Sequence, residues 1–152
     1  MSRERQDLLS RSALGVFRLN GRFLAVAEEL ARPAGLTAAW WQVLGAVLGE
    51  PLPVSGIARE MGITRQSVQR IADLLVDKGL AEYRPNPAHR RAKLLAPTEE
   101  GLAAVSRIDP GHAAFADRLA EAFGEAELAD AVRVLERMSK VLDGIAAPVT
   151  EP

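Results

Sequence analysis

The sequence predicts a mainly α-helical protein that carries one small β-hairpin. The chain has 152 residues, of which 48% are hydrophobic but only 5% aromatic, and its many Ala and Leu residues favour helices over sheets. Apolar residues recur three and four positions apart in long stretches at both ends, as one face of a helix requires. The middle is instead divided by single glycines into short segments, two of which are strand-like and flank a turn.

Two helices are predicted before residue 50. The helical spacing of apolar residues predicts the first over 5–31, and Pro33 ends it. Thr37 is a suitable N-cap for the second, because its side-chain oxygen can accept a hydrogen bond from a backbone N–H of the first turn. This second helix should reach about Leu48, before the glycine and prolines of residues 49–53 close it.

The middle of the chain predicts two helices joined by a turn and followed by a hairpin. Glycines separate the helices, and Asn86-Pro87-Ala88 is a turn signal between two strands. The expected order is a helix over 55–61, a turn at Gly62-Ile63, a helix over 65–78 with Thr64 as its N-cap and Gly79 after its end, a strand over 80–84 and a strand over 93–95.

Two further helices are predicted after the hairpin. One begins at Thr98, with two glutamates in its first turn, where the helix dipole favours acids. We expect it to be interrupted or kinked near Pro110-Gly111. The last helix spans about 125–145, and a frayed tail is expected after Ala146. One face of this last helix carries Leu128, Val132, Leu135, Met138, Val141, Leu142 and Ile145.

Composition excludes several kinds of chemistry. Without cysteine, the chain can form no disulfide, thiolate nucleophile or thiol redox switch. Two histidines disfavour a His-rich metal site, although a site built from carboxylates alone stays open. The N-terminus lacks the apolar stretch of a signal peptide, and the apolar runs are too short to span a bilayer. We therefore expect a cytoplasmic protein with no cofactor, no bound metal and no membrane partner.

Charge is unevenly distributed along the chain. The net charge is −1, which by itself disfavours binding to nucleic acid. Residues 54–93, however, hold eight Lys and Arg against four Asp and Glu, a net charge of +4, while the remainder carries −5. Because salt confines the reach of a charge to roughly 8–10 Å, a basic middle can act locally despite its acidic flanks.

The helix over 65–78 carries a polar face suited to DNA. Its apolar residues follow the i, i+3, i+4, i+7 pattern of a buried stripe. Arg and Gln, which can bond bidentately to guanine and adenine, gather in its first two turns. An ordinary solvated face is the alternative, since both are also good helix formers. The stripe is Val68, Ile71, Ala72 and Leu75, and the polar face is Arg65, Gln66, Gln69, Arg70 and Asp73, with Ser67 at the margin.

The hairpin gathers cations at its tip. His89, Arg90 and Arg91 are followed by Lys93, and such a row repels itself unless an anion lies nearby. A DNA minor groove or phosphate backbone supplies that anion. Charges that protect a sheet edge from pairing are the alternative, but they explain a whole row of cations less well.

Four stretches of the sequence resemble the MarR family of bacterial regulators. The helix-turn-helix alone would indicate only a winged-helix protein, whereas the hairpin wing and the stretch after it point to this family. The resemblance extends over nearly the whole chain, because the flanking helices also match the family's layout. The stretches are VSGIAREMGITRQSV at 54–68, DLLVDKGL at 73–80, NPAHRRAKLL at 86–95 and PTEEG at 97–101.

The resemblance implies a winged helix-turn-helix flanked by N- and C-terminal dimerisation helices. Residues 37–97 would form the DNA-binding domain, and residues 1–36 and 98–152 the helical dimerisation region. One helix would enter the major groove and the wing the minor groove. The wing departs from the family at His89, where an acid commonly precedes the paired arginines. The implied DNA contacts are Thr64, Arg65, Gln66, Ser67, Gln69 and Arg70 on the helix, and His89, Arg90, Arg91 and Lys93 on the wing.

The function implied is that of a ligand-responsive repressor that binds an inverted-repeat operator of double-stranded DNA as a homodimer. The resemblance also implies a pocket between the dimerisation helices and the winged domain for a small aromatic or anionic effector. The alternative is that Arg18 and Arg22 belong to a stripe that faces water and that one Trp of the adjacent pair is part of the core. The candidate pocket residues are Phe17, Arg18, Arg22, Trp40 and Trp41.

Two other classes of function stay open. A winged-helix module that binds protein rather than DNA would need the buried stripe but not the cations. An enzyme is disfavoured, because the sequence has no Gly-rich phosphate loop, nucleophile elbow or HExxH motif. The adjacent acids Glu28-Glu29 and Glu99-Glu100 face different directions on a helix, so they indicate helix charge rather than a catalytic pair.

Overall fold

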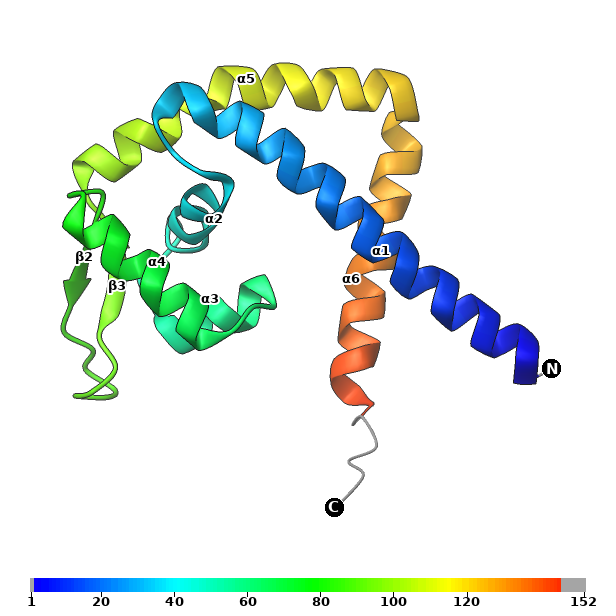
Figure 1. Ribbon diagram of the computed structural model, residues 1–152, viewed down its shortest axis with the longest axis horizontal. Coiled ribbons are helices and arrows are strands. Elements are labelled where there is room, and N and C mark those ends of the chain that lie inside the picture. The colour runs from blue at the N-terminus through cyan, green and yellow to red at the C-terminus, as the bar shows by residue number, and fades with distance from the viewer. Residues whose placement is uncertain (1, 146–152) are drawn as a thin grey trace. The chain divides into compact units, whose positions relative to one another are not determined.

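The computed structural model describes residues 2–145, which fall into two compact units that meet between Pro110 and Gly111. It confirms the predicted fold class, which is mainly helical with a small hairpin (Figure 1). The elements are α1 (Ser2–Ala31), the 3₁₀ helix η1 (Arg32–Ala34), α2 (Ala38–Ala46), β1 (Leu52–Pro53), α3 (Val54–Met61), α4 (Arg65–Asp77), β2 (Ala81–Arg84), β3 (Leu94–Pro97), α5 (Glu99–Phe123) and α6 (Glu125–Gly144).

The start of α2 is fixed from two sides. Thr37 accepts a hydrogen bond from the backbone N–H of Trp40 at 3.1 Å, which confirms it as the N-cap. Glu28, on α1, accepts a second bond from the backbone N–H of Ala38 at 2.9 Å. The first turn of a helix leaves its N–H groups without helical partners, so a side chain of α1 completes the cap of α2. The sequence pattern had assigned Glu28 only to helix charge.

The sheet has three antiparallel strands in the order β1-β3-β2. The sequence predicts the β2–β3 hairpin but not β1, in which Leu52 and Pro53 pair with Leu95 and Leu94. A two-residue strand shows no alternating pattern, and its proline resembled a helix stop. An edge strand tolerates proline because the missing N–H faces away from the sheet. The helix before it ends at Ala46, two residues earlier than expected.

A single apolar core holds the first unit together. It draws on α1, η1, all three middle helices, strands β2 and β3, and the start of α5. Within residues 2–145, no polar or charged side chain is buried. The core therefore extends beyond 37–97 at both ends, while the dimerisation role of the flanks stays a prediction. The largest fully buried side chains are Leu44, Ile57, Leu75, Leu95, Ile108, Val43, Val47 and Val68.

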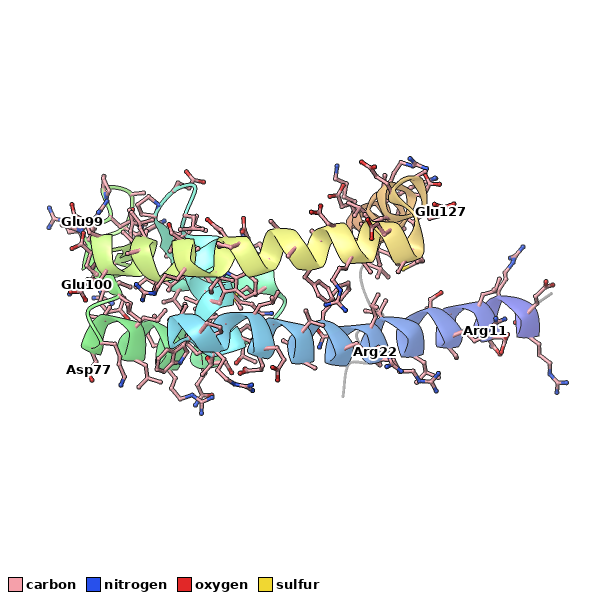
Figure 2. All side chains as sticks on the ribbon, turned by 90° about the horizontal axis from the view of Figure 1, so that it is seen from above. Arg11, Arg22, Asp77, Glu99, Glu100 and Glu127 are labelled. Atoms are coloured by element: carbon pink, nitrogen blue, oxygen red, sulfur yellow. The ribbon has the colours of Figure 1, made fainter. Side chains whose placement is uncertain are left out.

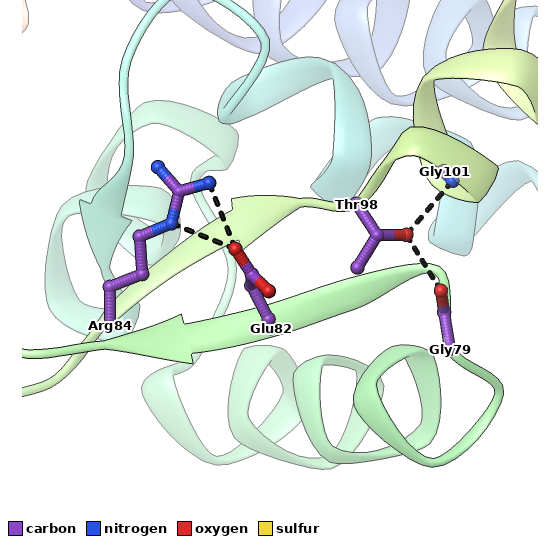
Figure 3. A network of polar contacts seen from close by, with 5 residues as sticks. All are labelled: Gly79, Glu82, Arg84, Thr98 and Gly101. Carbon is purple, nitrogen blue, oxygen red and sulfur yellow. Dashed lines mark hydrogen bonds and ion pairs between the residues drawn. The ribbon is translucent and has the colours of Figure 1, made fainter.

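Strand β3 passes into α5 through a single residue, Thr98 (Figure 3). The Thr98 hydroxyl donates to the carbonyl of Gly79 at 2.6 Å and accepts from the N–H of Gly101 at 3.1 Å. Its backbone N–H donates to the carbonyl of Leu80 at 3.1 Å. Thr98 thus caps α5 and ties it to the segment that follows α4.

A glycine is required at position 101 because the backbone of Leu80 approaches it closely. It is buried, and a Cβ placed on it would lie 2.0 Å from the carbonyl oxygen of Leu80. Since real Cβ contacts are never that short, any side chain would push α5 away from the sheet. The glutamates before it, Glu99 and Glu100, lie exposed at the start of α5, and Asp77 lies at the end of α4 (Figure 2).

Helix α5 is continuous from Glu99 to Phe123, so the interruption expected near Pro110 is wrong, whereas the kink that was the alternative stays a prediction. A proline inside a helix removes one backbone hydrogen bond and crowds the preceding turn. The bonds on either side of it remain, and alanines at positions 113 and 114 favour the helix after it. The loss of helical stability at Pro110 is therefore too small to end a helix of 25 residues.

The second unit consists of the rest of α5 and of α6. Gly124 joins them with φ +104°, in the left-handed region that favours glycine. No residue of α6 is buried. Its predicted apolar face is present and open, whereas the frayed tail expected after Ala146 lies outside the described residues. The exposed large apolar side chains of α6 and its C-cap are Val132, Val134, Leu135, Met138, Val141, Leu142 and Ile145.

Candidate nucleic-acid interface

The turn between α3 and α4 orients α4 on the surface of the first unit. Gly62 ends α3 with φ +67°, which lets the chain reverse within two residues. Thr64 then caps α4, as predicted, because its hydroxyl accepts from the backbone N–H of Ser67 at 3.1 Å. The same hydroxyl donates to the Ser67 side chain at 2.9 Å. Two of the candidate DNA contacts, Thr64 and Ser67, thus also fix the start of the helix.

Helix α4 divides into a buried and an exposed face where the sequence predicted the division. The stripe of Val68, Ile71, Ala72 and Leu75 is buried, with Ile71 at 8% exposure as the most open of the four. This stripe holds the helix against the core. The predicted polar residues Arg65, Gln66, Gln69 and Arg70 are all exposed.

The wing is the β2–β3 hairpin with its connection over 85–93 (Figure 1). Asn86 shapes this connection, because its side-chain oxygen accepts from the backbone N–H of Ala88 at 3.0 Å. Its carbonyl also accepts from the N–H of His89 at 3.3 Å. The four candidate DNA contacts of the wing, which are His89, Arg90, Arg91 and Lys93, are all exposed.

Helix α4 and the wing border a shared open groove of about 630 Å³. Side chains of α4 line it together with wing residues and the β1–α3 corner. A second cavity of about 390 Å³ lies under the wing and is lined by Arg90 and Lys93 among others. Tyr83 and Lys93 line both spaces. The residues of the larger groove are Pro53, Val54, Ser55, Arg65, Gln66, Gln69, Tyr83, Arg91, Ala92 and Lys93.

The cations of this surface are not neutralised by the protein. Within residues 2–145, the five candidate cations on α4 and the wing form no ion pair. Arg84 differs, because its guanidinium lies 2.9 Å from Glu82 (Figure 3). Unpaired exposed cations are the groups that phosphate oxygens bind. The five are Arg65, Arg70, Arg90, Arg91 and Lys93.

A polar cluster joins α4 to β2 beside the larger groove. The Gln69 amide nitrogen donates to Asp73 Oδ1 and to Tyr83 Oη, both at 3.0 Å. The Tyr83 hydroxyl donates to the same Asp73 oxygen. Burial, followed by the hydrogen bond and charge of Asp73, raises the pKa of Tyr83 to about 12. The hydroxyl therefore stays protonated and remains a donor over the whole neutral range.

Tyr83 is a member of the candidate site that the sequence pattern does not predict. It is the only tyrosine of the chain, and Gln69 and Asp73 are four positions apart, a spacing that puts two side chains on one helix face. Both features can be read from the sequence and could have directed attention to these residues. The partnership across 14 positions, from α4 to β2, depends on tertiary structure that no local pattern contains.

The candidate pocket residues lie in two different environments. Phe17, which is 69% exposed, and the exposed Arg18 and Arg22 are open on α1, as Figure 2 shows for Arg22. Trp40 and Trp41 are half-buried on α2 and pack against the core. The Lys78 ammonium lies 5.9 Å from the centre of the Trp40 ring, within cation–π reach. The single chain therefore does not enclose the three α1 side chains.

Residues 2–145 contain neither a membrane-spanning helix nor a metal-binding cluster. No helix in this range is long and apolar enough to cross a membrane. No three His, Asp or Glu side chains of the range lie close enough together to hold a metal ion.

Comparison with known sequences identifies a family and related proteins. A family model described as MarR family matches residues 34–92, which cover α2, α3, α4, β2 and most of the wing. The protein Rv2011c of Mycobacterium tuberculosis is 40% identical over 132 residues, which are 87% of this chain and 92% of that protein.

Solved structures match over nearly the full length. The transcriptional repressor CouR bound to a 23-mer DNA duplex aligns with a TM-score of 0.74 and 25% identity, over 88% of this chain and 95% of CouR. CouR from Rhodococcus jostii bound to p-coumaroyl-CoA aligns with a TM-score of 0.61 and 24% identity, over 90% of this chain and 92% of CouR.

These matches agree with the geometry of the interface. The family model covers the helix-turn-helix, and the aligned structures include the flanking helices. The matched family and structures are those of transcription regulators and not of enzymes, which sets aside the enzyme alternative. The chain therefore belongs to the MarR family and is a winged helix-turn-helix, DNA-binding transcription regulator.

Proposed function

We propose that the protein is a homodimeric repressor that binds an inverted-repeat operator and releases it on binding a small effector. The observation that carries this proposal is the surface of five unpaired cations spread over α4 and the wing. A bacterial repressor acts on cytoplasmic DNA, so the proposed location is the cytoplasm.

The two parts of the interface have different tasks in this proposal. Arg65, Gln66 and Arg70 on the first turns of α4 discriminate bases in the major groove, because Arg and Gln can bond bidentately to base edges. Arg90 and Arg91 on the wing, with His89 and Lys93, supply contacts to the backbone or the minor groove. Thr64 and Ser67 lie at the helix start, where hydroxyls commonly contact phosphates.

The proposed dimer covers apolar surface that a single chain leaves open. Helix α6 has no buried residue, and Leu142 is 59% exposed. Contiguous apolar faces of this kind mark association surfaces in soluble proteins. Helix α1 shows the same feature, since Leu9 and Phe17 are 66% and 69% exposed. A closed two-fold dimer would cover equal faces on both copies.

The proposed effector is a small aromatic or anionic compound. CouR, which shares the fold, is described with bound p-coumaroyl-CoA, an aromatic and anionic ligand. The candidate contacts offer both kinds of group, with aromatic rings at Phe17, Trp40 and Trp41 and guanidinium groups at Arg18 and Arg22. In a dimer, the exposed side chains of α1 would meet the second copy or a ligand instead of water.

Selection from random DNA duplexes tests the proposal in one experiment. A two-fold dimer places its recognition helices about 34–36 Å apart, so the selected site should be an inverted repeat with half-site centres about 10 bp apart. Affinity for it should fall steeply with salt. A selection that returned a single asymmetric half-site would refute the dimeric arrangement, and binding without salt dependence would refute the role of the cations.

A further inference from the structure

Gln69 has little freedom left to read a base. A glutamine that recognises adenine uses its amide N–H as donor and its carbonyl as acceptor. The Gln69 amide nitrogen carries two hydrogens, and it already donates to two oxygens, Asp73 Oδ1 and Tyr83 Oη. Only its carbonyl oxygen stays available, so bidentate recognition would require breaking the cluster.

Gln66 differs from Gln69 in this respect. It lies one turn earlier on α4, is exposed and lines the same groove. Its side chain forms no hydrogen bond within residues 2–145. The carbonyl oxygen and the NH2 group of its side-chain amide are therefore both available to a base. Comparing Gln66 with Gln69 thus separates a free glutamine from one that is already bonded.

Tyr83 is placed to set the distance between α4 and the wing. It belongs to β2, where it faces Leu95 of β3 in the hairpin register. It is half-buried, packs against the core and lines both cavities beside the wing. Its hydroxyl closes a ring of hydrogen bonds with two residues of α4, and this ring is a polar contact between the two DNA-binding elements.

We infer that Gln69, Asp73 and Tyr83 form a positioning cluster that holds the wing at a fixed distance from α4, and that Gln66 rather than Gln69 reads the operator. The inference rests on the proposed function, in which α4 and the wing bind one DNA duplex together. The wing arginines reach DNA in register with α4 only if the two elements keep their separation. The cluster acts through that separation and touches neither base nor phosphate.

The test measures operator affinity, base preference and salt dependence for five variants of the full-length protein. Tyr83→Phe removes only the hydroxyl, Gln69→Ala removes the amide, and Gln66→Ala is the matched control on the same helix. Asp73→Asn and the double variant Tyr83→Phe/Asp73→Asn complete a mutant cycle. Circular dichroism and thermal unfolding establish that each variant is folded.

The cluster predicts a specific combination of results. Tyr83→Phe and Gln69→Ala should each weaken operator binding by roughly two- to tenfold, the effect of one or two lost hydrogen bonds. Neither should relax the preference at any one base position, and both should lower the salt slope, because a displaced wing loses contacts between its cations and phosphates. Tyr83→Phe and the double variant should bind alike, since the two groups act as one unit. Gln66→Ala should instead relax the preference at one position.

Three results would overturn the inference. If Gln69→Ala relaxes one operator position, Gln69 reads a base. If Tyr83→Phe weakens binding without lowering the salt slope, the hydroxyl does not act through the wing cations. If Tyr83→Phe and Asp73→Asn both bind like the parent, the cluster does not position the wing. Failure of the parent protein to bind any duplex would instead reject the proposed function itself, and with it the positioning role.

Discussion

At the scale of single residues, Gly101 allows the first turn of α5 to pack directly against the backbone of Leu80 because glycine has no side chain. Its Cα faces the carbonyl of Leu80 so closely that a Cβ would lie 2.0 Å from the oxygen. Both partners are backbone, so no rotamer change can relieve the contact. The adjoining Thr98 hydroxyl bridges the carbonyl of Gly79 and the N–H of Gly101. Thr98 and Gly101 of the PTEEG stretch are therefore explained by local structure, although the sequence alone presents this stretch only as part of a resemblance.

We predict that Gly101→Ala lowers the free energy of unfolding by about 1–3 kcal/mol or more, because overpacking forces the backbone to shift. Urea unfolding monitored by circular dichroism measures the change. Gly45→Ala is the matched control, since a Cβ there meets nothing within 4 Å. In an exposed helix position this control should be neutral or stabilising by up to about 1 kcal/mol. Equal effects of the two substitutions would contradict the steric explanation.

Tyr83 should also give the protein a signature at alkaline pH. Because its pKa rises to about 12 from the ordinary 10.0, the folded state holds the phenolic proton more tightly than the unfolded state does. The corresponding stability is fully present below pH 10 and is lost as the pH rises toward 12. Tyr83→Phe should lack this loss, which unfolding measurements across the alkaline range can detect.

The control for this titration uses the same phenol. Tyr83 is the only tyrosine, so ultraviolet absorbance of the phenolate reports on it alone. Asp73→Asn should lower the Tyr83 pKa, because the negative charge of Asp73 contributes to its rise. Part of the rise should persist, since burial is its largest cause. An unchanged titration in Asp73→Asn would show that the cluster does not form in solution.

At the scale of elements, α4 was the most predictable part of the fold and β1 the least. The stripe of α4 repeats over four residues, all of which are buried, and both of its end signals, Thr64 and Gly79, hold in the structure. Strand β1 exists only through its pairing with β3. The candidate site could be predicted only in part for the same reason, since contacts between distant segments leave no local pattern. The exposure of Arg65 and Arg70 follows from the helix pattern, whereas the hydrogen bond of Gln69 to Tyr83 depends on the tertiary fold.

The division of tasks between α4 and the wing predicts different effects for two arginines. Arg70→Ala should cost about 1–3 kcal/mol on the selected operator and relax one base position. Arg90→Ala should weaken selected and random duplexes alike and reduce the salt slope by about one. Neither arginine forms an ion pair within residues 2–145, so both variants should keep their stability.

Titration of DNA binding at several salt concentrations measures both effects. Arg84→Ala is a useful control, because that guanidinium is paired with Glu82 and should contribute less to the salt slope. Identical losses for Arg70→Ala and Arg90→Ala on selected and random DNA would contradict the division of tasks.

At the scale of the whole molecule, the open apolar face of α6 predicts an obligatory partner. Leu142→Glu places a charge on a side chain that is 59% exposed in the single chain, so it should not disturb the monomer fold. It should abolish the dimer, as should deletion from Glu125 onward, with monomer or aggregate as the product. Sedimentation velocity at micromolar concentration measures the state.

The matched control for α6 is Lys140→Glu. Lys140 is exposed on the same helix, and this substitution changes charge while removing no apolar surface, so the dimer should persist. A parent protein that sediments as a monomer would reject the proposed dimer and, with it, the inverted-repeat operator.

The single-residue passage from β3 to α5 has a mechanical consequence. No loop separates the strand from the helix, and the Thr98 hydroxyl joins the first turn of α5 to the carbonyl of Gly79 after α4. A rotation of that first turn must therefore move Thr98, and through it both the strand that leads into the wing and the segment that ends α4. A movement of the first turn of α5 is in this way transmitted to the wing and to the end of α4 together, without any molecule touching the DNA-binding surface.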